Sequence, residues 1–388
     1  MVCLARHRVG TEVAFFLQDL DGGGAERAIV SLAGEIANRG HGVDLVVGDA
    51  DGEYRTEVSP AVRIENFATR SPLRVLGRLS TYLHRRKPAV VMSALDVANI
   101  MLIAAARISA YRGRTVISQR AVVAAAHPEL SPGRRLLIAL LRRVLFRRAD
   151  ALVSNSFAAA GEVQAFLGVR PDRIAVIPNA VDADRIGRLA KLPLDDYWIS
   201  KSRCPLIVSV GSVTTRKDLR TLIKAFAIVK ARRDVRLAVI GKGYQPAERQ
   251  RIERLILDLG LSESVYLPGF DPNPYKWMAA AAVFVNSATA EGFPNVIAEA
   301  LVVGRPVVAT NCPGDTAELL QNGKWGRLVP VGDSERMAAA ILDALDDPNS
   351  PDGRIRAADF SPARTVDAYL KVLLPKPETQ ASGSRQPL

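Results

Sequence analysis

The chain has 388 residues, 48% of them hydrophobic and 24% charged, and it carries a formal net charge of +12. This length and composition exclude a disordered chain and predict a soluble protein with room for two folded domains. The three cysteines are scattered without Cys-x-x-Cys spacing, which gives no disulfide framework and no metal site and favours a reducing compartment. The positive charge predicts an anionic partner: a nucleic acid, a membrane face or a phosphorylated substrate.

No segment of the sequence predicts secretion or a membrane span. The stretch before Thr11 holds three arginines or histidines, and the apolar run Val13–Leu17 is too short for a signal core. The longest apolar segment, Ala89–Ala106, carries Asp96 and Asn99, so we expect a strand followed by a buried helix there. A cytoplasmic protein is therefore predicted.

The first half of the chain alternates strands and helices. An apolar strand over 12–17 leads into a glycine-rich loop over 19–27, and a helix follows that Gly40 ends. A strand at 43–47 completes a unit typical of doubly wound α/β folds. The glycine-rich loop alone is a weak signal, because a tight turn with close packing also explains it. Further strands are predicted at 90–93, 115–118 and 151–156, and the segment 173–182 is predicted to close the first domain.

A polar linker over 183–203 is predicted to separate this part from a second series of strands and helices. The strands of that series are predicted at 205–211, 236–240, 282–285 and 304–310. We therefore expect two doubly wound, Rossmann-like α/β domains, over residues 1–185 and 203–356. A helix over 357–375 and a disordered tail over 376–388, rich in Pro, Ser and Gln, end the chain.

A basic amphipathic helix is predicted over 131–148. Its apolar positions are Leu136, Leu137, Leu140, Leu141, Val144 and Leu145, and its arginines are Arg134, Arg135, Arg142, Arg143, Arg147 and Arg148. Such a helix suits an anionic membrane surface, but its apolar face can also pack on the first domain and leave the arginines in solvent. Nucleic acid is the weaker option, because no aromatic side chains are interleaved with the charge.

Two carboxylates flank a predicted helix start in the second half. Glu291 and Glu299 are separated by seven residues, and the Gly-Phe-Pro-Asn turn at 292–295 opens the helix. Such a helix start can bind a phosphate or a sugar diphosphate, because it offers free N–H groups and the positive end of the helix dipole. Both glutamates can instead be ordinary, because the dipole alone favours Glu in the first turns of a helix.

The run from Glu291 to Glu299, followed by Ala300, Leu301, Gly304, Pro306, Val307 and Val308, resembles the signature of glycosyltransferase family 4. These are retaining enzymes of the GT-B fold, in which two domains face a cleft and the C-terminal helix crosses back to the first domain. The resemblance covers roughly residues 12–345. It implies that Glu291 contacts the transferred sugar and Glu299 the ribose of the nucleotide. The residues implied to meet the sugar and the diphosphate between them are Phe293, Pro294, Asn295 and Val296.

The resemblance also implies the phosphate contacts. The family pattern Gly-Arg-x-x-x-x-Lys matches here at Lys217, which is implied to bind the diphosphate, whereas Ser212 stands where the arginine is usual. Arg216 is the substitute that we expect, since an arginine fork can hold two phosphate oxygens, although it can also simply begin a solvated helix. The glycines implied to line the donor site are Gly23, Gly24, Gly211 and Gly241.

The residues expected to contact the acceptor depart from the family pattern. Many members place a histidine after the strand at 115–118, where it contacts the transferred sugar, and this sequence has Gln119 and Arg120 there. We expect Arg120 to contact an anionic acceptor. His127 can swing into the site from its loop or remain a solvated loop histidine.

These features predict retaining transfer of a hexose or N-acetylhexosamine from a UDP-sugar. Lys217, Arg216 and the helix amides would stabilise the charge that builds on the leaving diphosphate. No Asp-x-Asp motif ends a predicted strand, so we expect no metal cofactor. The basic first domain predicts a lipid-linked or glycan acceptor at the inner face of the cell membrane, and no nucleic-acid partner. The alternative is a catalytically inactive nucleotide-sugar-binding protein of the same fold.

Overall fold

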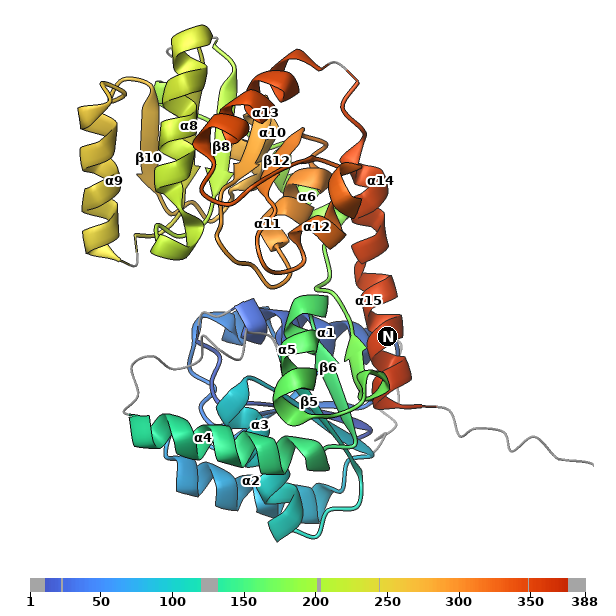
Figure 1. Ribbon diagram of the computed structural model, residues 1–388. Coiled ribbons are helices and arrows are strands. Elements are labelled where there is room, and N and C mark those ends of the chain that lie inside the picture. The colour runs from blue at the N-terminus through green and yellow to red at the C-terminus, as the bar shows by residue number, and fades with distance from the viewer. Residues whose placement is uncertain are drawn as a thin grey trace, which may run out of the picture.

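Two α/β domains make up the protein, one above the other in Figure 1. The computed structural model describes residues 11–21, 24–119, 132–200, 204–243, 245–347 and 349–375. Each domain is built around one parallel sheet with helices on both faces. The apolar strands predicted from the sequence supply most of these two sheets, whereas the strand at 63–66, which is not buried, was not predicted.

The first sheet has seven parallel strands in the order β3-β2-β1-β4-β5-β6-β7. Their bounds are β1 Val13–Leu17, β2 Val43–Val47, β3 Arg63–Asn66, β4 Val90–Ala94, β5 Arg114–Gln119, β6 Ala151–Ser154 and β7 Ile174–Val176. In β1 every residue is buried, because helices cover both faces of a parallel sheet. Val13 pairs with Val43 on one side and with Val90 on the other, so the strand order reverses at β1 and β4.

The second sheet has six parallel strands in the order β10-β9-β8-β11-β12-β13. Their bounds are β8 Leu206–Val210, β9 Arg236–Ile240, β10 Val265–Gly269, β11 Val283–Asn286, β12 Val307–Thr310 and β13 Arg327–Val329. The order reverses between β8 and β11. Ligands of open α/β sheets bind at such a switch point, beyond the carboxyl ends of the strands.

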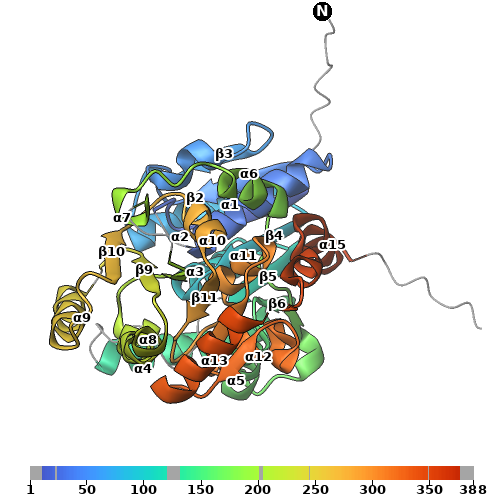
Figure 2. The same ribbon diagram turned by 90° about the horizontal axis from the view of Figure 1, so that it is seen from above.

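The helices divide between the two domains. The first domain holds α1 Gly24–Asn38, α2 Pro72–Arg86, α3 Asp96–Ile108, α4 Pro132–Leu145 and α5 Phe157–Leu167. The second holds α6 Ala183–Ala190, α7 Tyr197–Ser200, α8 Leu219–Arg232, α9 Pro246–Asp258, α10 Tyr275–Ala280, α11 Asn295–Val302, α12 Thr316–Leu319, α13 Ser334–Asp346 and α14 Gly353–Ala357. Seen from above, α8 and α13 cover one face of the second sheet, and α10 and α11 cover the other (Figure 2).

The segment predicted as a linker is instead part of the second domain. It forms α6 and α7, and Ile186 is buried in the core that α10 and α11 also line. Asp182 caps α6, because its carboxylate accepts a hydrogen bond from the N–H of Arg185 at 2.8 Å. The polar composition of the segment 183–203 therefore reflects the solvent-exposed face of α6 and does not indicate an unstructured linker.

The last helix, α15 Pro362–Leu373, returns to the first domain (Figure 1). Val366, Tyr369 and Leu373 are buried in the core beneath β1, β2 and β4. Arg39, which directly follows α1, forms an ion pair with Asp367 and donates a hydrogen bond to the carbonyl oxygen of Ala363 at 3.0 Å. The chain therefore passes between the domains twice, once before α6 and once before α15.

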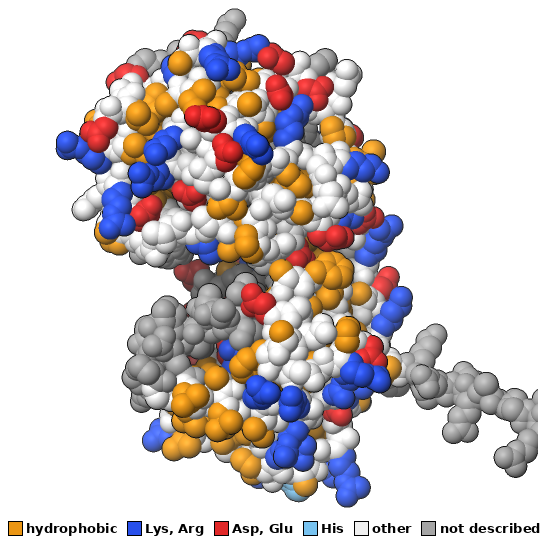
Figure 3. Space-filling model, in the orientation of Figure 1, with side chains coloured by type: hydrophobic (Ala, Val, Ile, Leu, Met, Phe, Trp, Pro, Cys, Tyr) orange, Lys and Arg blue, Asp and Glu red, His pale blue; other side chains and the backbone are white. Residues whose placement is uncertain are grey.

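Five of the six apolar side chains predicted on helix α4 lie in solvent, and the sixth, Leu145, packs partly against the core of the first domain. Leu136, Leu137, Leu140, Leu141 and Val144 are exposed, with Leu136 72% accessible, so the alternative in which this face packs on the first domain is wrong. Arg142 is buried instead, because its guanidinium lies 3.3 Å from the carboxylate of Asp96 and stacks over the rings of Phe146 and Phe166. Figure 3 shows hydrophobic side chains gathered at the level of α4, with basic side chains beside them. No helix within the described ranges is long and apolar enough to cross a membrane.

Candidate active site

One carboxylate and two cations meet at the switch point of the second sheet. Glu291 follows β11 and Lys217 follows β8, and the Nζ of Lys217 forms an ion pair with Oε1 of Glu291. Nη1 of Arg216 lies 3.0 Å from Oε2 of the same carboxylate. Glu291 is only 8% accessible, whereas the side chain of Arg216 is 55% accessible. The lysine and the glutamate thus form the buried base of the cluster, and the arginine extends into solvent above it.

Hydrogen bonds to the exit of β11 fix the loop that carries both cations. The N–H of Thr289 donates to the carbonyl oxygen of Arg216 at 2.8 Å, and the hydroxyl of Ser287 donates to that of Lys217 at 2.8 Å. Asn286, the last residue of β11, places Nδ2 3.5 Å from Oε1 of Glu291. Because each loop residue is bonded at its backbone, the charged ends are positioned before any ligand binds.

Two of the predicted glycines let the backbones of this site approach closely. A Cβ atom on Gly241 would lie 2.0 Å from the carbonyl oxygen of Gly211, so no side chain fits there. A Cβ atom on Gly211 would lie 3.1 Å from Cε of Lys217. Gly211 and Gly241 therefore allow the turns after β8 and β9 to pack together and leave room for the lysine side chain.

A short strap of residues 313–315 supports Glu291 from behind. The N–H of Glu291 donates to the carbonyl oxygen of Pro313 at 3.0 Å, and the N–H of Asp315 donates to that of Gly292 at 3.1 Å. Between them, Gly314 has φ +129°, and a Cβ atom there would lie 1.8 Å from the carbonyl oxygen of Glu291. The strap and the Glu291 loop are therefore in backbone contact.

The turn after Glu291 contributes backbone rather than side chains. Phe293 is buried and packs edge-on against Phe360, with ring centroids 5.2 Å apart, so its side chain belongs to the core. Pro294 is also buried and directly precedes α11, and Val296 packs partly into the same core. Asn295 is exposed, and its Oδ1 accepts a hydrogen bond from Nδ2 of Asn179 at 3.0 Å, which links the second domain to the segment between the domains.

Glu299 lies one turn further along α11, in a cavity of about 280 Å³ between the domains. Tyr275 donates a hydrogen bond to Oε1 of Glu299 at 3.2 Å, and Arg27 of the first domain and Arg185 of α6 line the same cavity. Burial raises the pKa of Glu299 to about 7, against the opposing effects of Tyr275 and the two arginines. The structure thus places Glu299 beside Asn295, and not in contact with Lys217.

The raised pKa of Glu299 predicts a proton-linked change in stability. The folded-state pKa of about 7 lies above the ordinary value of 4.5, so the native state holds a proton that the unfolded state has released between these pH values. The free energy of unfolding is therefore expected to fall as the pH rises from about 5 to about 7 and then to level off. Urea denaturation of the wild type and of Glu299→Gln across this range measures it. A wild-type slope that the glutamine variant shares would contradict the assignment.

Of the other predicted site residues, only Gly24 lies within the described part of the chain. Gly23, Arg120 and His127 lie outside the described residues, and Gly24 is the first residue of α1. Tyr275, Asn286 and Asp315 contact the site but are not among the predicted residues. Of these three residues, only Asn286 could have been predicted from a sequence pattern, because it is a polar residue at the carboxyl end of a buried strand. Tyr275 and Asp315 reach the site through tertiary contacts that no local pattern indicates.

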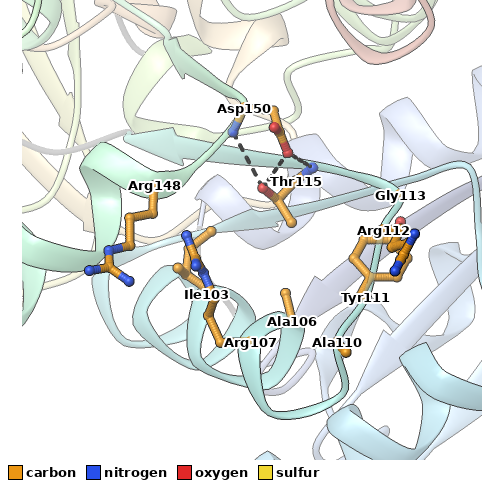
Figure 4. A pocket seen from close by; sticks show the side chains of 10 residues that line it. All are labelled: Ile103, Ala106, Arg107, Ala110, Tyr111, Arg112, Gly113, Thr115, Arg148 and Asp150. Atoms are coloured by element: carbon orange, nitrogen blue, oxygen red, sulfur yellow. Dashed lines mark hydrogen bonds between the residues drawn. The ribbon is translucent and has the colours of Figure 1, made fainter.

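A second pocket, of about 400 Å³, lies in the first domain, at the end of the sheet where the strands begin (Figure 4). It lies near the amino ends of β5 and β6, where Asp150 accepts hydrogen bonds from the N–H and the hydroxyl of Thr115, both at 2.7 Å. Arg107, Arg112 and Arg148 line it, and none of the three is paired with a described carboxylate. This cationic pocket adjoins the end of α4 and shares no lining residue with the cavity that holds Glu299.

Comparisons with known proteins agree with this geometry. A family profile described as Glycosyltransferase Family 4 matches residues 22–185, and one described as Glycosyl transferases group 1 matches residues 204–347. The lipopolysaccharide core biosynthesis glycosyltransferase LpsE of Rhizobium meliloti is 30% identical over 92% of this chain and 97% of its own length. An N-acetylgalactosaminyltransferase of Campylobacter jejuni that acts on a diphospho-undecaprenol acceptor is 30% identical over 60% of this chain, which covers 62% of that protein.

Solved structures show the same architecture. HepE of Anabaena, in complex with UDP, superposes with a TM-score of 0.76 at 22% identity, covering 94% of this chain and 99% of that one. Two parallel-sheet domains with this topology are the architecture of the GT-B fold. The chain belongs to glycosyltransferase family 4. The predicted family and fold class are therefore confirmed.

Proposed function

We propose that this glycosyltransferase moves a sugar from a UDP-sugar to a lipid-linked or glycan acceptor in lipopolysaccharide or polysaccharide biosynthesis, with retention at the anomeric carbon. The observation that carries the proposal is the cluster of Lys217, Arg216 and Glu291 at the switch point. The named activities of the Rhizobium and Campylobacter relatives support the acceptor class, and UDP in the Anabaena structure supports the donor class.

The chemistry follows from the charges in the cluster. When the bond between the sugar and the diphosphate breaks, negative charge builds on the leaving oxygen, and cations held in place beforehand stabilise it. Lys217 and Arg216 are positioned to do so, and we propose that they act without a metal ion. Glu291 keeps both cations in the site and orients the transferred sugar. Glu299 is proposed to hold the ribose hydroxyls from the adjoining cavity.

A donor panel tests the function directly. Saturation-transfer NMR with UDP-glucose, UDP-galactose, UDP-N-acetylglucosamine, UDP-N-acetylgalactosamine and matching ADP- and GDP-sugars would identify the nucleotide and the sugar. We expect signal from one or two UDP-sugars, and release of UDP when an undecaprenyl-diphosphate glycan is added. Signal from no nucleotide sugar would contradict the transferase proposal, and binding without turnover over a set of acceptors would favour the binding-protein alternative.

We also propose that α4 docks the first domain on an anionic membrane at the inner face of the cell membrane. Its exposed leucines can enter the interface while neighbouring arginines meet headgroups, and each such arginine contributes about 1 kcal/mol. Arg143 on α4 and the arginines of the cationic pocket at its end supply that charge. This surface would bring a lipid-linked acceptor to the cleft.

Replacing exposed leucines tests the docking without changing charge. Leu137→Ser with Leu140→Ser is expected to weaken binding to vesicles containing phosphatidylglycerol by about 10-fold or more, because two apolar side chains are lost from the interface. The matched control is Leu257→Ser with Ile355→Ser, two equally exposed apolar residues of the second domain. Sedimentation measures both. An equal loss in the control pair, or no preference for anionic over neutral vesicles, would contradict the docking surface.

A further inference from the structure

One carboxylate of the second domain is bonded into the first. Asp315 is 4% accessible, and its two oxygens accept hydrogen bonds from the N–H groups of Phe157 and Ala158 at 2.8 and 3.0 Å. These are the first two residues of α5. Ser156 caps the same helix by accepting from the N–H of Ala159 at 3.1 Å. The first three amides of α5 are therefore satisfied, two of them from the other domain.

The physical strength of this contact comes from charge and geometry together. The amino end of an 11-residue helix carries partial positive charge, and a carboxylate there forms charge-assisted hydrogen bonds. Burial raises the pKa of Asp315, and the amides of Ala158 and Phe157 oppose that shift. Opening the contact would leave two amides and a carboxylate without these partners. It is thus a specific junction between the domains.

The same residue is tied to the catalytic cluster. The N–H of Asp315 donates to Gly292, and the neighbouring carbonyl of Pro313 accepts from Glu291. Gly314 lies against the backbone of Glu291 with no space for a side chain. A continuous path therefore leads from the backbone of Glu291 through the strap to the amino end of α5. It contains only short backbone contacts and two hydrogen bonds to a buried carboxylate.

We propose that Asp315 is a positioning residue for sugar transfer, which fixes the first domain relative to Glu291 although it need not touch either substrate. The proposal rests on the proposed function, since it assumes that the acceptor is held by the first domain and the donor by the second. Misplacement of reacting groups by about 1 Å can cost 10²-fold in rate. The contact therefore bears on the transfer step and not on donor binding.

Asp315→Ala, Asp315→Asn and a matched control, Asp333→Ala, test the proposal. Asp333 also caps a helix, accepting from the N–H of Arg336 at 2.9 Å, but entirely within the second domain. We expect Asp315→Ala to lower kcat for transfer about 10-fold or more with the KM for the donor unchanged. Asp315→Asn, which keeps one acceptor oxygen, should fall between the alanine variant and the wild type. Asp333→Ala should change neither constant.

Two measurements do not depend on turnover and separate this proposal from the proposed function. Small-angle X-ray scattering should show a larger radius of gyration for Asp315→Ala than for the wild type and Asp333→Ala, and calorimetry should show UDP affinity unchanged. If no transfer is found but the scattering differs as expected, the junction stands and the proposed function fails. An unchanged radius of gyration together with unchanged kcat would overturn the junction. Equal loss of kcat in Asp333→Ala would overturn it too, because stability alone would then explain the effect.

Discussion

Glu291→Gln is expected to lower kcat for sugar transfer by about 10²- to 10³-fold, the effect of removing one preorganised charge from an active site. The carboxylate is the shared partner of Arg216 and Lys217, and it is buried at the base of the cluster. The amide keeps the shape and one acceptor oxygen, so both cations remain close but lose the charge that orients them. Steady-state kinetics with the donor found by the NMR panel measure the effect.

The control for this change is Glu318→Gln, which alters the same charge on an exposed residue of the same domain. Thermal unfolding of both variants separates a catalytic loss from a loss of fold. We expect the control to keep wild-type kcat and KM. A Glu291→Gln enzyme with more than about a third of wild-type kcat would rule out a role for this carboxylate in the reaction, because a single lost transition-state contact has a larger effect.

Gly314→Ala is expected to cost about 3 kcal/mol or more of stability, and to lower kcat by about 10²-fold in the protein that still folds. The residue has φ +129°, and the new methyl group would meet the carbonyl oxygen of Glu291 at 1.8 Å. Since that oxygen is backbone and cannot swing aside, either the strap or the Glu291 loop must move. Denaturation and kinetics on the same preparation measure the two effects.

Gly323→Ala separates the backbone effect from the steric one. Gly323 has φ +102°, and nothing lies within 4 Å of the position that a Cβ atom would take. This variant is therefore expected to cost only about 1 kcal/mol, the usual effect of placing alanine at a positive φ, and to leave kcat unchanged. Equal stability losses in the two variants would mean that contact with Glu291 is not what requires glycine at 314.

Sequence reasoning reached the parts of this protein that local patterns determine. The buried strands read as apolar runs, and Glu291 and Lys217 follow two of them, so a parallel sheet brings them to one edge. Helical periodicity located α4 but could not say what covers its apolar face, because periodicity carries no information about the partner. The structure leaves that face open and buries Arg142 instead.

The junction at Asp315 was beyond such reasoning for another reason. Asp315 and Phe157 are 158 residues apart and meet only because two separately folded sheets face each other. An aspartate at a helix start reads as an ordinary cap of its own helix, and here it caps a helix of the other domain. The same limit applies to Tyr275, whose hydrogen bond to Glu299 joins two helices that no motif links.

The return of α15 to the first domain has a consequence for biosynthesis on the ribosome. Val366, Tyr369 and Leu373 fill the core beneath β1, β2 and β4, yet they are translated after the whole second domain. Until they emerge, the nascent first domain has an apolar groove beside α1, while the second domain can already complete its own core. Maturation of the first domain therefore waits for the codons of α15, and a ribosome stalled before Pro362 would hold a chain that chaperones recognise.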